Sequence, residues 1–296
     1  MEEVIDGPYP TLYADLLCTV DGLKAFHCKR MGLRLVPAWP LEQKLLEMGW
    51  SESDRPAAIV GEHIFNHRSL LACAWGKPSR AFGPIYEVFD THRRVARLPG
   101  PPYHFMTRVE SIDGAIGSME PDQRVEVAYD VPADAWYFGE NGARTMPLCV
   151  LMEAALQPCG WLASFVGSAL TSETDLCFRN LDGTSTLYRE IRPGDGTMTT
   201  RSTITNISQS AGMIIESFSV TCHIGDTLVY DLDTVFGFFP KEALENQIGL
   251  PTSESDRAAL ASEGEAFDLA ARPACFFGSS VRLPEAALLM IDRVRG

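Results

Sequence analysis

The feature that most constrains this chain is a long apolar run, residues 145–172, which contains a single formal charge, Glu153. A carboxylate is costly to bury among apolar side chains, so it must either find hydrogen-bond partners or serve as an acid in chemistry. Gln157 is the next strongly polar side chain, and a spacing of four residues places it on the same helix face as Glu153. The run therefore predicts a buried helix with one polar pair.

The apolar run leaves three interpretations open. Glu153 is a structural acid satisfied by backbone groups, or it is a catalytic acid, or the run spans a membrane. The membrane interpretation is the weakest, because an acid, a glutamine, a proline and two glycines interrupt the run and no basic cluster flanks it. Pro147 suits a first helical turn, and Pro158 predicts a kink.

Charge and cysteine usage narrow the class of protein. The 296 residues include 25 lysines and arginines against 39 acids, a net charge of −14 that disfavours nucleic acid or an anionic membrane as the main partner. The first residues are acidic and form no apolar signal core, so no secretory signal is predicted. Eight cysteines without CxxC spacing indicate reduced core residues in a cytoplasmic protein.

Two weak internal repeats indicate how the chain is organised. Arg97–Val109 and Arg282–Val294 share Arg-Leu-Pro, an apolar stretch and Arg-Val. Cys18–Pro37 and Cys222–Pro240 each contain a strand, a Gly/Asp turn and a second strand that ends at proline, which is typical of a hairpin.

The order of these repeats predicts an excerpt of a longer multidomain polypeptide. We expect residues 1–60 to hold the tail hairpin of a preceding unit and a linker. Residues 61–240 form one complete unit, and residues 241–296 hold a linker, with one or two short surface helices, and the start of a following unit.

Within the complete unit, the pattern predicts an α+β fold in which an antiparallel sheet wraps around one buried helix. Asn66 is expected to cap a short helix through Ala74, and a Gly/Pro-rich turn is expected at 76–84. The long helix is expected over Leu148–Ala169, with a turn at 206–210 and another at Gly225-Asp226. Strands are predicted at 107–112, 124–130, 175–180, 187–192, 197–207, 213–224 and 228–238.

Several of these segments, taken in order, resemble a known family. Arg97–Val109, Val125–Val131, Trp136–Gly139, Met146-Pro147 and Glu153–Gln157 follow the order seen in hot-dog-fold 3-hydroxyacyl-ACP dehydratases of the β-hydroxydecanoyl-ACP dehydratase type. The stretch around the long helix looks closest to the dehydratase regions of polyunsaturated fatty acid synthases and iterative type I polyketide synthases. The resemblance covers about residues 66–240 and implies a hot-dog fold, a long central helix wrapped by an antiparallel β-sheet.

The resemblance also implies a reaction and its residues. Family members eliminate water from a 3-hydroxyacyl thioester on acyl carrier protein to give a 2-enoyl product. Glu153 falls on the helix carboxylate that protonates the departing hydroxyl, and Gln157 falls on the polar residue that orients it. The helix start, where backbone amides hold the thioester carbonyl, corresponds to Met146, Leu148 and Cys149, which are the expected substrate-binding residues.

One family residue is missing from the pattern. The base is a histidine fourteen residues before the helix carboxylate, and that position is Gly139 here. We expect a hydro-lyase that is inactive alone, with the histidine supplied by a neighbouring hot-dog unit or a homodimer partner. A degenerate scaffold and an acyl-binding or dimerisation module without chemistry are the alternatives.

The same chemistry sets the expected cofactors and partners. No organic cofactor and no metal are expected, because elimination needs only an acid and a base, and no His/Cys cluster has ligand spacing. The expected partner is an acyl carrier protein domain with a phosphopantetheine-linked acyl chain. No nucleic acid and no membrane span are expected, and the location is expected to be cytoplasmic.

Overall fold

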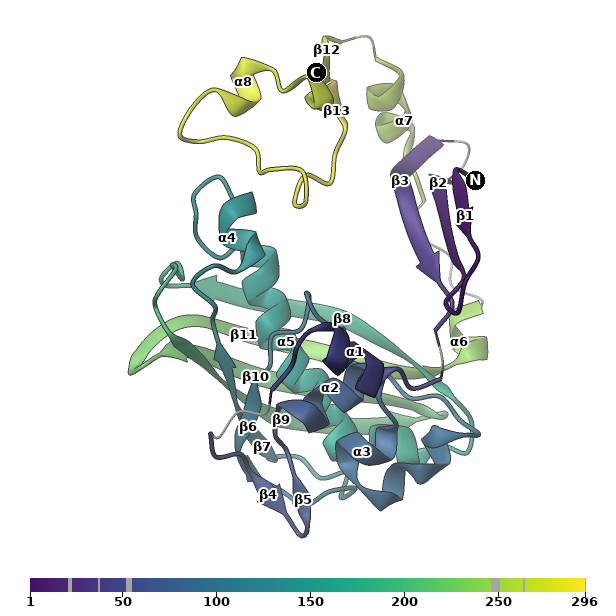
Figure 1. Cartoon of the computed structure of the whole chain (residues 1–296), viewed down its shortest axis with the longest axis vertical. Coiled ribbons are helices and arrows are strands. Elements are labelled where there is room, and N and C mark those ends of the chain that lie inside the picture. Colours follow the sequence, from purple (N-terminus) through teal and green to yellow (C-terminus); the bar gives the residue numbers. More distant parts are fainter. Residues whose placement is uncertain (21–22, 37, 52–54, 246–250, 263, 296) are drawn as a thin grey trace.

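The centre of the molecule is one long helix, α5 (Leu148–Phe165), wrapped by a six-stranded antiparallel sheet (Figure 1). The computed structural model describes residues 1–20, 23–36, 38–51, 55–245, 251–262 and 264–295. The order of the strands across the sheet is β6 (Arg108–Asp113), β7 (Arg124–Asp130), β9 (Thr197–Ser210), β10 (Met213–Ile224), β11 (Thr227–Pro240) and β8 (Leu176–Leu187). This is the expected α+β hot-dog fold.

The sheet faces the helix because apolar residues recur at every second position of its central strands. In β10, Ile214, Phe218 and Val220 are buried, while Ile215, Ser217 and Ser219 between them are less covered. Small side chains let the helix approach closely, and the Cys159 Sγ of α5 lies 3.2 Å from the Ser202 Oγ of β9. The alternation of buried and more exposed side chains along these strands therefore fixes which face of the sheet packs against α5.

A helical layer covers the side of α5 that the sheet leaves open. It consists of α2 (His67–Trp75), α3 (Pro78–Phe82) and the 3-10 helix η1 (Pro84–Asp90), with α1 (Leu41–Glu47) beside α2. Trp161 of α5 meets Phe65 and Phe82 at ring-centroid distances of 5.1 and 5.7 Å. Leu148–Thr171 is the one described segment long and apolar enough to cross a membrane, and most of it is buried inside this fold.

Several element boundaries differ from the sequence prediction. The central helix ends at Phe165 because Gly167 adopts φ +95°, and the 3-10 helix η2 (Ser168–Thr171) follows. The turn predicted at 76–84 contains α3, which starts at Pro78, a favoured first helical residue. The predicted Asn66 cap is confirmed, since its side chain accepts a hydrogen bond from the backbone N–H of Ser69 at 3.1 Å.

One strand prediction is wrong, and one strand and one turn have different bounds. No strand continues through 188–192 in the described chain, whereas the strand predicted at 175–180 is β8, which runs on to Leu187. Its residues are mostly exposed and polar and so show no readable alternation. The turn predicted at 206–210 lies later, because β9 continues to Ser210 and the chain reverses at Ala211 and Gly212, both with positive φ. The turn at Gly225-Asp226 is confirmed.

The N-terminal residues form a separate three-stranded sheet, β1 (Glu3–Ile5), β2 (Thr11–Val20) and β3 (Leu23–Arg34), as Figure 1 shows. The predicted hairpin is confirmed, and its resemblance to β10–β11 extends to the register; its turn at 21–22 and Pro37 lie outside the described residues. Each hairpin shifts register directly after its cysteine. The matching pairs are Cys18↔Phe26 with Cys222↔Tyr230, Thr19↔Lys24 with His223↔Leu228, and Val20↔Leu23 with Ile224↔Thr227.

The C-terminal residues hold more short elements than a linker with one or two helices. One segment docks on α4 (Trp136–Glu140), where the backbone N–H of Glu285 donates to the Glu140 carbonyl at 2.8 Å. The C-terminal elements are α6 (Lys241–Glu245), α7 (Glu254–Ala261), β12 (Ala266–Asp268), η3 (Leu269–Ala271), α8 (Ala274–Phe277) and β13 (Arg293–Arg295).

Two short strands, β4 (Ile59–Val60) and β5 (His63–Ile64), precede α2.

Candidate functional site

Glu153 lies in the second turn of α5 and is half-buried. It lines a cavity of about 140 Å³ between α5, the end of α2, the segment 96–99 and the outer strands of the sheet. The walls are mainly apolar, with a few polar groups. The lining residues are Cys73, Ala96, Arg97, Leu98, Pro99, Glu153, Leu156, Gln157, Gly160, Ser164, Phe178, Asn180 and Phe236. A carboxylate that faces an apolar cavity can act on a bound molecule.

Gln157 holds Glu153 and the segment 103–105 in place. Its Nε2 group donates to Glu153 Oε1 at 3.0 Å and to the Tyr103 carbonyl at 2.9 Å, and its Oε1 accepts from the Phe105 N–H at 2.8 Å. Both amide protons are therefore used within the protein. The structure thus brings Glu153 and Gln157 together as the helical spacing predicted, and gives Gln157 a positioning geometry.

The three residues expected at the thioester site lie at the start of α5, apart from this cavity. Met146 is buried and its N–H donates to the Ile191 carbonyl at 2.8 Å, which fixes where the helix begins. Leu148 and Cys149 are exposed in the first turn, and none of the three lines the cavity. The Tyr103 carbonyl accepts from Gln157, and burial, followed by the charge of Glu153, raises the pKa of the Tyr103 hydroxyl.

The Arg-Leu-Pro motif contributes to the site in a way the sequence did not reveal. Arg97, Leu98 and Pro99 line the cavity. The Arg97 guanidinium donates to the carbonyls of Ala72, Ala74 and Gly76 at 3.0, 3.0 and 2.5 Å, so it caps the C-terminal end of α2. The signal that could have identified this segment was its repetition at Arg282.

None of the six histidines, all of which are described, lines the cavity. His104 lies beside the site, because Gln157 binds the residues on either side of it. Its side chain is buried, its Nδ1 lies 3.0 Å from the Pro99 carbonyl, and its ring stacks on His67 at 5.9 Å. Burial lowers the pKa of His104 to about 4, so the ring is neutral.

Gly139, which occupies the position of the family histidine, is exposed on α4. A Cβ atom built on Gly139 would meet no atom within 4 Å. This position is therefore open, and a larger side chain fits there without displacing its neighbours.

The most deeply buried acid among the described residues is Glu216, which sequence reasoning missed. It lies on β10 with an exposed fraction of 0% and contacts Ser168 Oγ. Ser168 follows the C-terminal end of α5, whereas Glu153 lies near the start of that helix. Burial raises the pKa of Glu216 to about 7. Its position in phase with Ile214 and Phe218 is the signal that could have identified it.

The described residues offer no cluster of three or more His, Cys, Asp or Glu side chains suited to a metal ion. All eight cysteines are unpaired, and three of them, Cys73, Cys159 and Cys222, are buried. Burial raises the pKa of each of these three thiols, which makes them poor nucleophiles. The chemistry available at the cavity is therefore that of Glu153.

A comparison of sequences relates the chain to one curated protein. In an alignment 201 positions long that covers 63% of the chain, it is 31% identical to a polyunsaturated fatty acid synthase polypeptide of Thraustochytrium sp.. The aligned stretch spans only 13% of that protein's length. No protein-family model matches the chain.

Solved structures share part of the fold. A putative thioesterase from Shewanella oneidensis is similar with a TM-score of 0.30 and 13% identity, over 40% of this chain and 76% of that one. A hypothetical thioesterase from Streptococcus pneumoniae, solved with coenzyme A, gives a TM-score of 0.30 and 12% identity, over 43% of this chain and 84% of that one. The antiparallel sheet and its central helix make this an α+β hot-dog domain, and its sequence is related to one stretch of a polyunsaturated fatty acid synthase.

Proposed function

We propose that this hot-dog domain acts on 3-hydroxyacyl thioesters within a multifunctional fatty acid or polyketide synthase, with Glu153 as the general acid of a dehydratase site. The single observation that carries this proposal is the position of Glu153, whose carboxylate is held by Gln157 and lines an apolar cavity. A carboxylic acid at that point can protonate the hydroxyl that leaves C3 while a base removes a proton from C2.

The position of the cavity in the sheet supports a shared site. Phe178 and Asn180 of β8 line the cavity, and β8 is an edge strand that pairs only with β11 among the described strands. An unpaired edge is a surface on which another strand can add. A second hot-dog unit, from a neighbouring domain or another copy, would there approach Glu153 and could bring the missing histidine.

The register match of the two hairpins supports the proposed domain organisation. Since β2–β3 repeats the pairing and the bulge of β10–β11, we interpret residues 1–60 as the closing strands of another hot-dog unit with a linker. Residues 61–240 are the complete unit, and 241–296 are a linker with the start of a further unit. In this organisation the carrier domain is part of the same synthase, and the site is cytoplasmic.

The competing proposal is a degenerate scaffold, which the absence of a histidine from the cavity favours. Both predict that the chain alone does not hydrate 2-enoyl thioesters, so turnover does not separate them. Binding of an acyl thioester does separate the two proposals, because an acid that serves catalysis must face the bound thioester, whereas a structural acid need not.

The test is calorimetric titration of the chain with a 2-enoyl pantetheine thioester. Gly160 lines the cavity and its Cβ would meet no atom within 4 Å, so Gly160→Leu fills the cavity without a clash. Met152 is exposed on the same helix outside the cavity, and Met152→Phe is the matched control.

We expect the wild type and Met152→Phe to bind the thioester and Gly160→Leu to bind it at least about tenfold more weakly. Glu153→Gln should keep the affinity, because glutamine preserves size and hydrogen bonding. Equal affinities of the wild type and Gly160→Leu would show that this cavity is not the acyl site, and no binding at all would favour the scaffold.

A further inference from the structure

The layer that α2, α3 and η1 form over α5, taken with the loop that follows it to Arg97, has a charge opposite to that of the rest of the chain. Residues 67–97 contain six lysines and arginines and two acids, a net charge of +4, whereas the whole chain carries −14. The remaining residues therefore carry −18. A compact basic surface on an acidic protein selects the orientation in which an acidic partner arrives, because every other surface repels it.

Three cations of this layer are free to meet a partner. Lys77, Arg80 and Arg94 are exposed, and none of them forms an ion pair or a side-chain hydrogen bond with a described residue. The other three cations are engaged: Arg68 pairs with Glu42, Arg93 donates to the Ala169 and Thr174 carbonyls, and Arg97 caps α2. We define the basic face as Lys77, Arg80 and Arg94 with the exposed surface between them.

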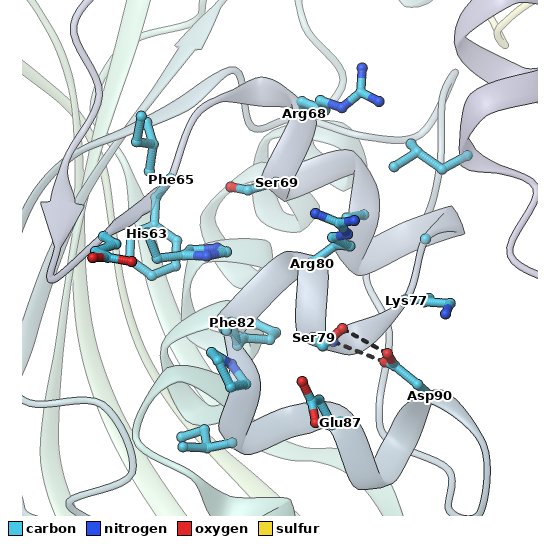
Figure 2. Close-up of a pocket in the computed structure, with 18 of the residues that line it drawn as sticks. His63, Phe65, Arg68, Ser69, Lys77, Ser79, Arg80, Phe82, Glu87 and Asp90 are labelled. Carbon is cyan, nitrogen blue, oxygen red and sulfur yellow. Dashed lines mark hydrogen bonds between the residues drawn. The ribbon is translucent and has the colours of Figure 1, made fainter.

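The basic face is hollowed rather than flat. Lys77 and Arg80 line a cavity of about 1250 Å³ against α2, α3 and η1, and Figure 2 shows them with Arg68 on the side opposite His63. Four acids also line this cavity. Glu42 is paired with Arg68, and Asp90 accepts from the backbone N–H and the hydroxyl of Ser79 at 3.0 and 2.7 Å, while Glu62 and Glu87 lie in the same lining as Lys77 and Arg80.

Apolar side chains are interspersed with these cations. Ile85 and Val88 of η1 are 46% and 37% exposed. Arg94 lines a second hollow of about 350 Å³, together with Trp39, Trp75 and Phe89. A surface that combines free cations with exposed apolar groups suits a folded acidic domain, which offers carboxylates and apolar side chains together.

The second hollow adjoins the Glu153 cavity. Arg97 lines both of them, so the segment 94–97 separates the basic face from the site of the proposed reaction. A partner held at Arg94 would therefore have a short path for a flexible arm to Glu153.

We propose that the basic face is the docking surface for an acidic carrier domain, with Arg94 and Lys77 meeting its carboxylates and the phosphate of its prosthetic arm. This inference rests on the proposed function, which supplies a carrier-bound substrate. A long polyanion such as nucleic acid fits less well, because the positive surface is confined to one layer and the remaining −18 charge repels an extended chain.

The test compares two triple charge reversals. Lys77→Glu, Arg80→Glu and Arg94→Glu together remove the basic face. Lys29→Glu, Arg124→Glu and Arg257→Glu change the net charge by the same amount at exposed residues elsewhere, on β3, β7 and α7. Neither set includes a residue that lines the Glu153 cavity.

Binding of a fluorescently labelled acyl carrier protein, with its phosphopantetheine arm attached, is measured by anisotropy at low and physiological salt. We expect the basic-face variant to bind about tenfold or more weakly than the wild type and the control variant to stay within about twofold. The wild-type affinity should fall as salt is added.

Each other outcome has a definite meaning. An equal loss of carrier affinity in both variants, or no loss in the basic-face variant, overturns the docking proposal. Binding of anionic vesicles through the basic face, without binding of the carrier, also overturns it. Titration with the carrier-free 2-enoyl pantetheine thioester separates the two proposals. If all variants bind it but the wild type does not bind the carrier, only the docking proposal fails. If none binds it and carrier binding still depends on the basic face, only the proposed function fails.

Discussion

Replacing Glu216 by glutamine should change how stability depends on pH. Burial raises the pKa of Glu216 from 4.5 to about 7, so the folded chain holds this proton more tightly than the unfolded chain does. The stabilisation is complete below pH 4.5 and is lost as pH rises to about 7. With 1.36 kcal/mol for each unit of pKa, the loss amounts to about 3 kcal/mol.

The local hydrogen bonds agree with a protonated carboxyl. Ser168 has one hydroxyl proton and two oxygen acceptors within reach, the Ala163 carbonyl at 2.8 Å and Glu216. If the hydroxyl donates to Ala163, a protonated Glu216 can donate to Ser168 Oγ, whereas an ionised carboxylate would compete for the same proton. Glutamine can take over the donor role at every pH.

The assay is urea unfolding of the wild type and Glu216→Gln at a series of pH values between 4.5 and 8. The difference in the free energy of unfolding should move in favour of the variant by about 3 kcal/mol as pH rises across that window. Glu190→Gln, which makes the same substitution at an exposed position, is the matched control. A Glu216→Gln difference that is constant with pH would refute the reasoning.

Three further substitutions test other parts of the account. His104→Leu should act in the opposite sense, because burial lowers the pKa of His104 from 6.5 to about 4. The free energy of unfolding of the wild type should therefore fall by about 3 kcal/mol relative to that of the variant as pH falls through that window. Urea unfolding at each pH measures this difference, and a difference that is constant with pH would contradict the prediction. Gln157→Ala should lower the free energy of unfolding by about 3 kcal/mol, since it leaves the Phe105 N–H and the Tyr103 carbonyl without partners; a loss below about 1 kcal/mol would mean that water replaces the amide. Gly160→Leu should raise the free energy of unfolding by up to about 1 kcal/mol through helix propensity, while it weakens thioester binding at least about tenfold; a strongly destabilised variant would show that the cavity cannot hold the side chain.

The sequence predicted the central part of the fold because that part depends on strong local signals. A run with one charge can be stable only if it is covered, and α5 is covered by the sheet on one side and by α2, α3 and η1 on the other. The hairpins were predictable from their turns. The strand β8 was not, because an exposed edge strand imposes no alternation on its residues.

The candidate site was only partly predictable. Spacing along one helix identified the Glu153–Gln157 pair, which the structure joins at 3.0 Å. The cavity beside it requires Arg97 from one loop and Phe178 from β8, which only tertiary folding brings together. Glu216 was not predicted as a buried acid, although its place among the buried residues of β10 is visible in the alternation.

The most direct test of the central claim restores the missing base. Gly139 is exposed and has room for a side chain, so Gly139→His places an imidazole at the position of the family histidine, from which it would serve the Glu153 of a paired second copy. Hydration of a 2-enoyl pantetheine thioester is then measured for the wild type, Gly139→His, and Gly139→His combined with Glu153→Gln.

We expect negligible turnover by the wild type and turnover by Gly139→His that is higher by about 10²-fold or more, which is the scale of general-base catalysis. Adding Glu153→Gln should abolish this gain while the thioester still binds. A gain that persists without the Glu153 carboxyl, or robust hydration by the wild-type chain, would contradict the claim that Glu153 is the acid of a site whose base is missing.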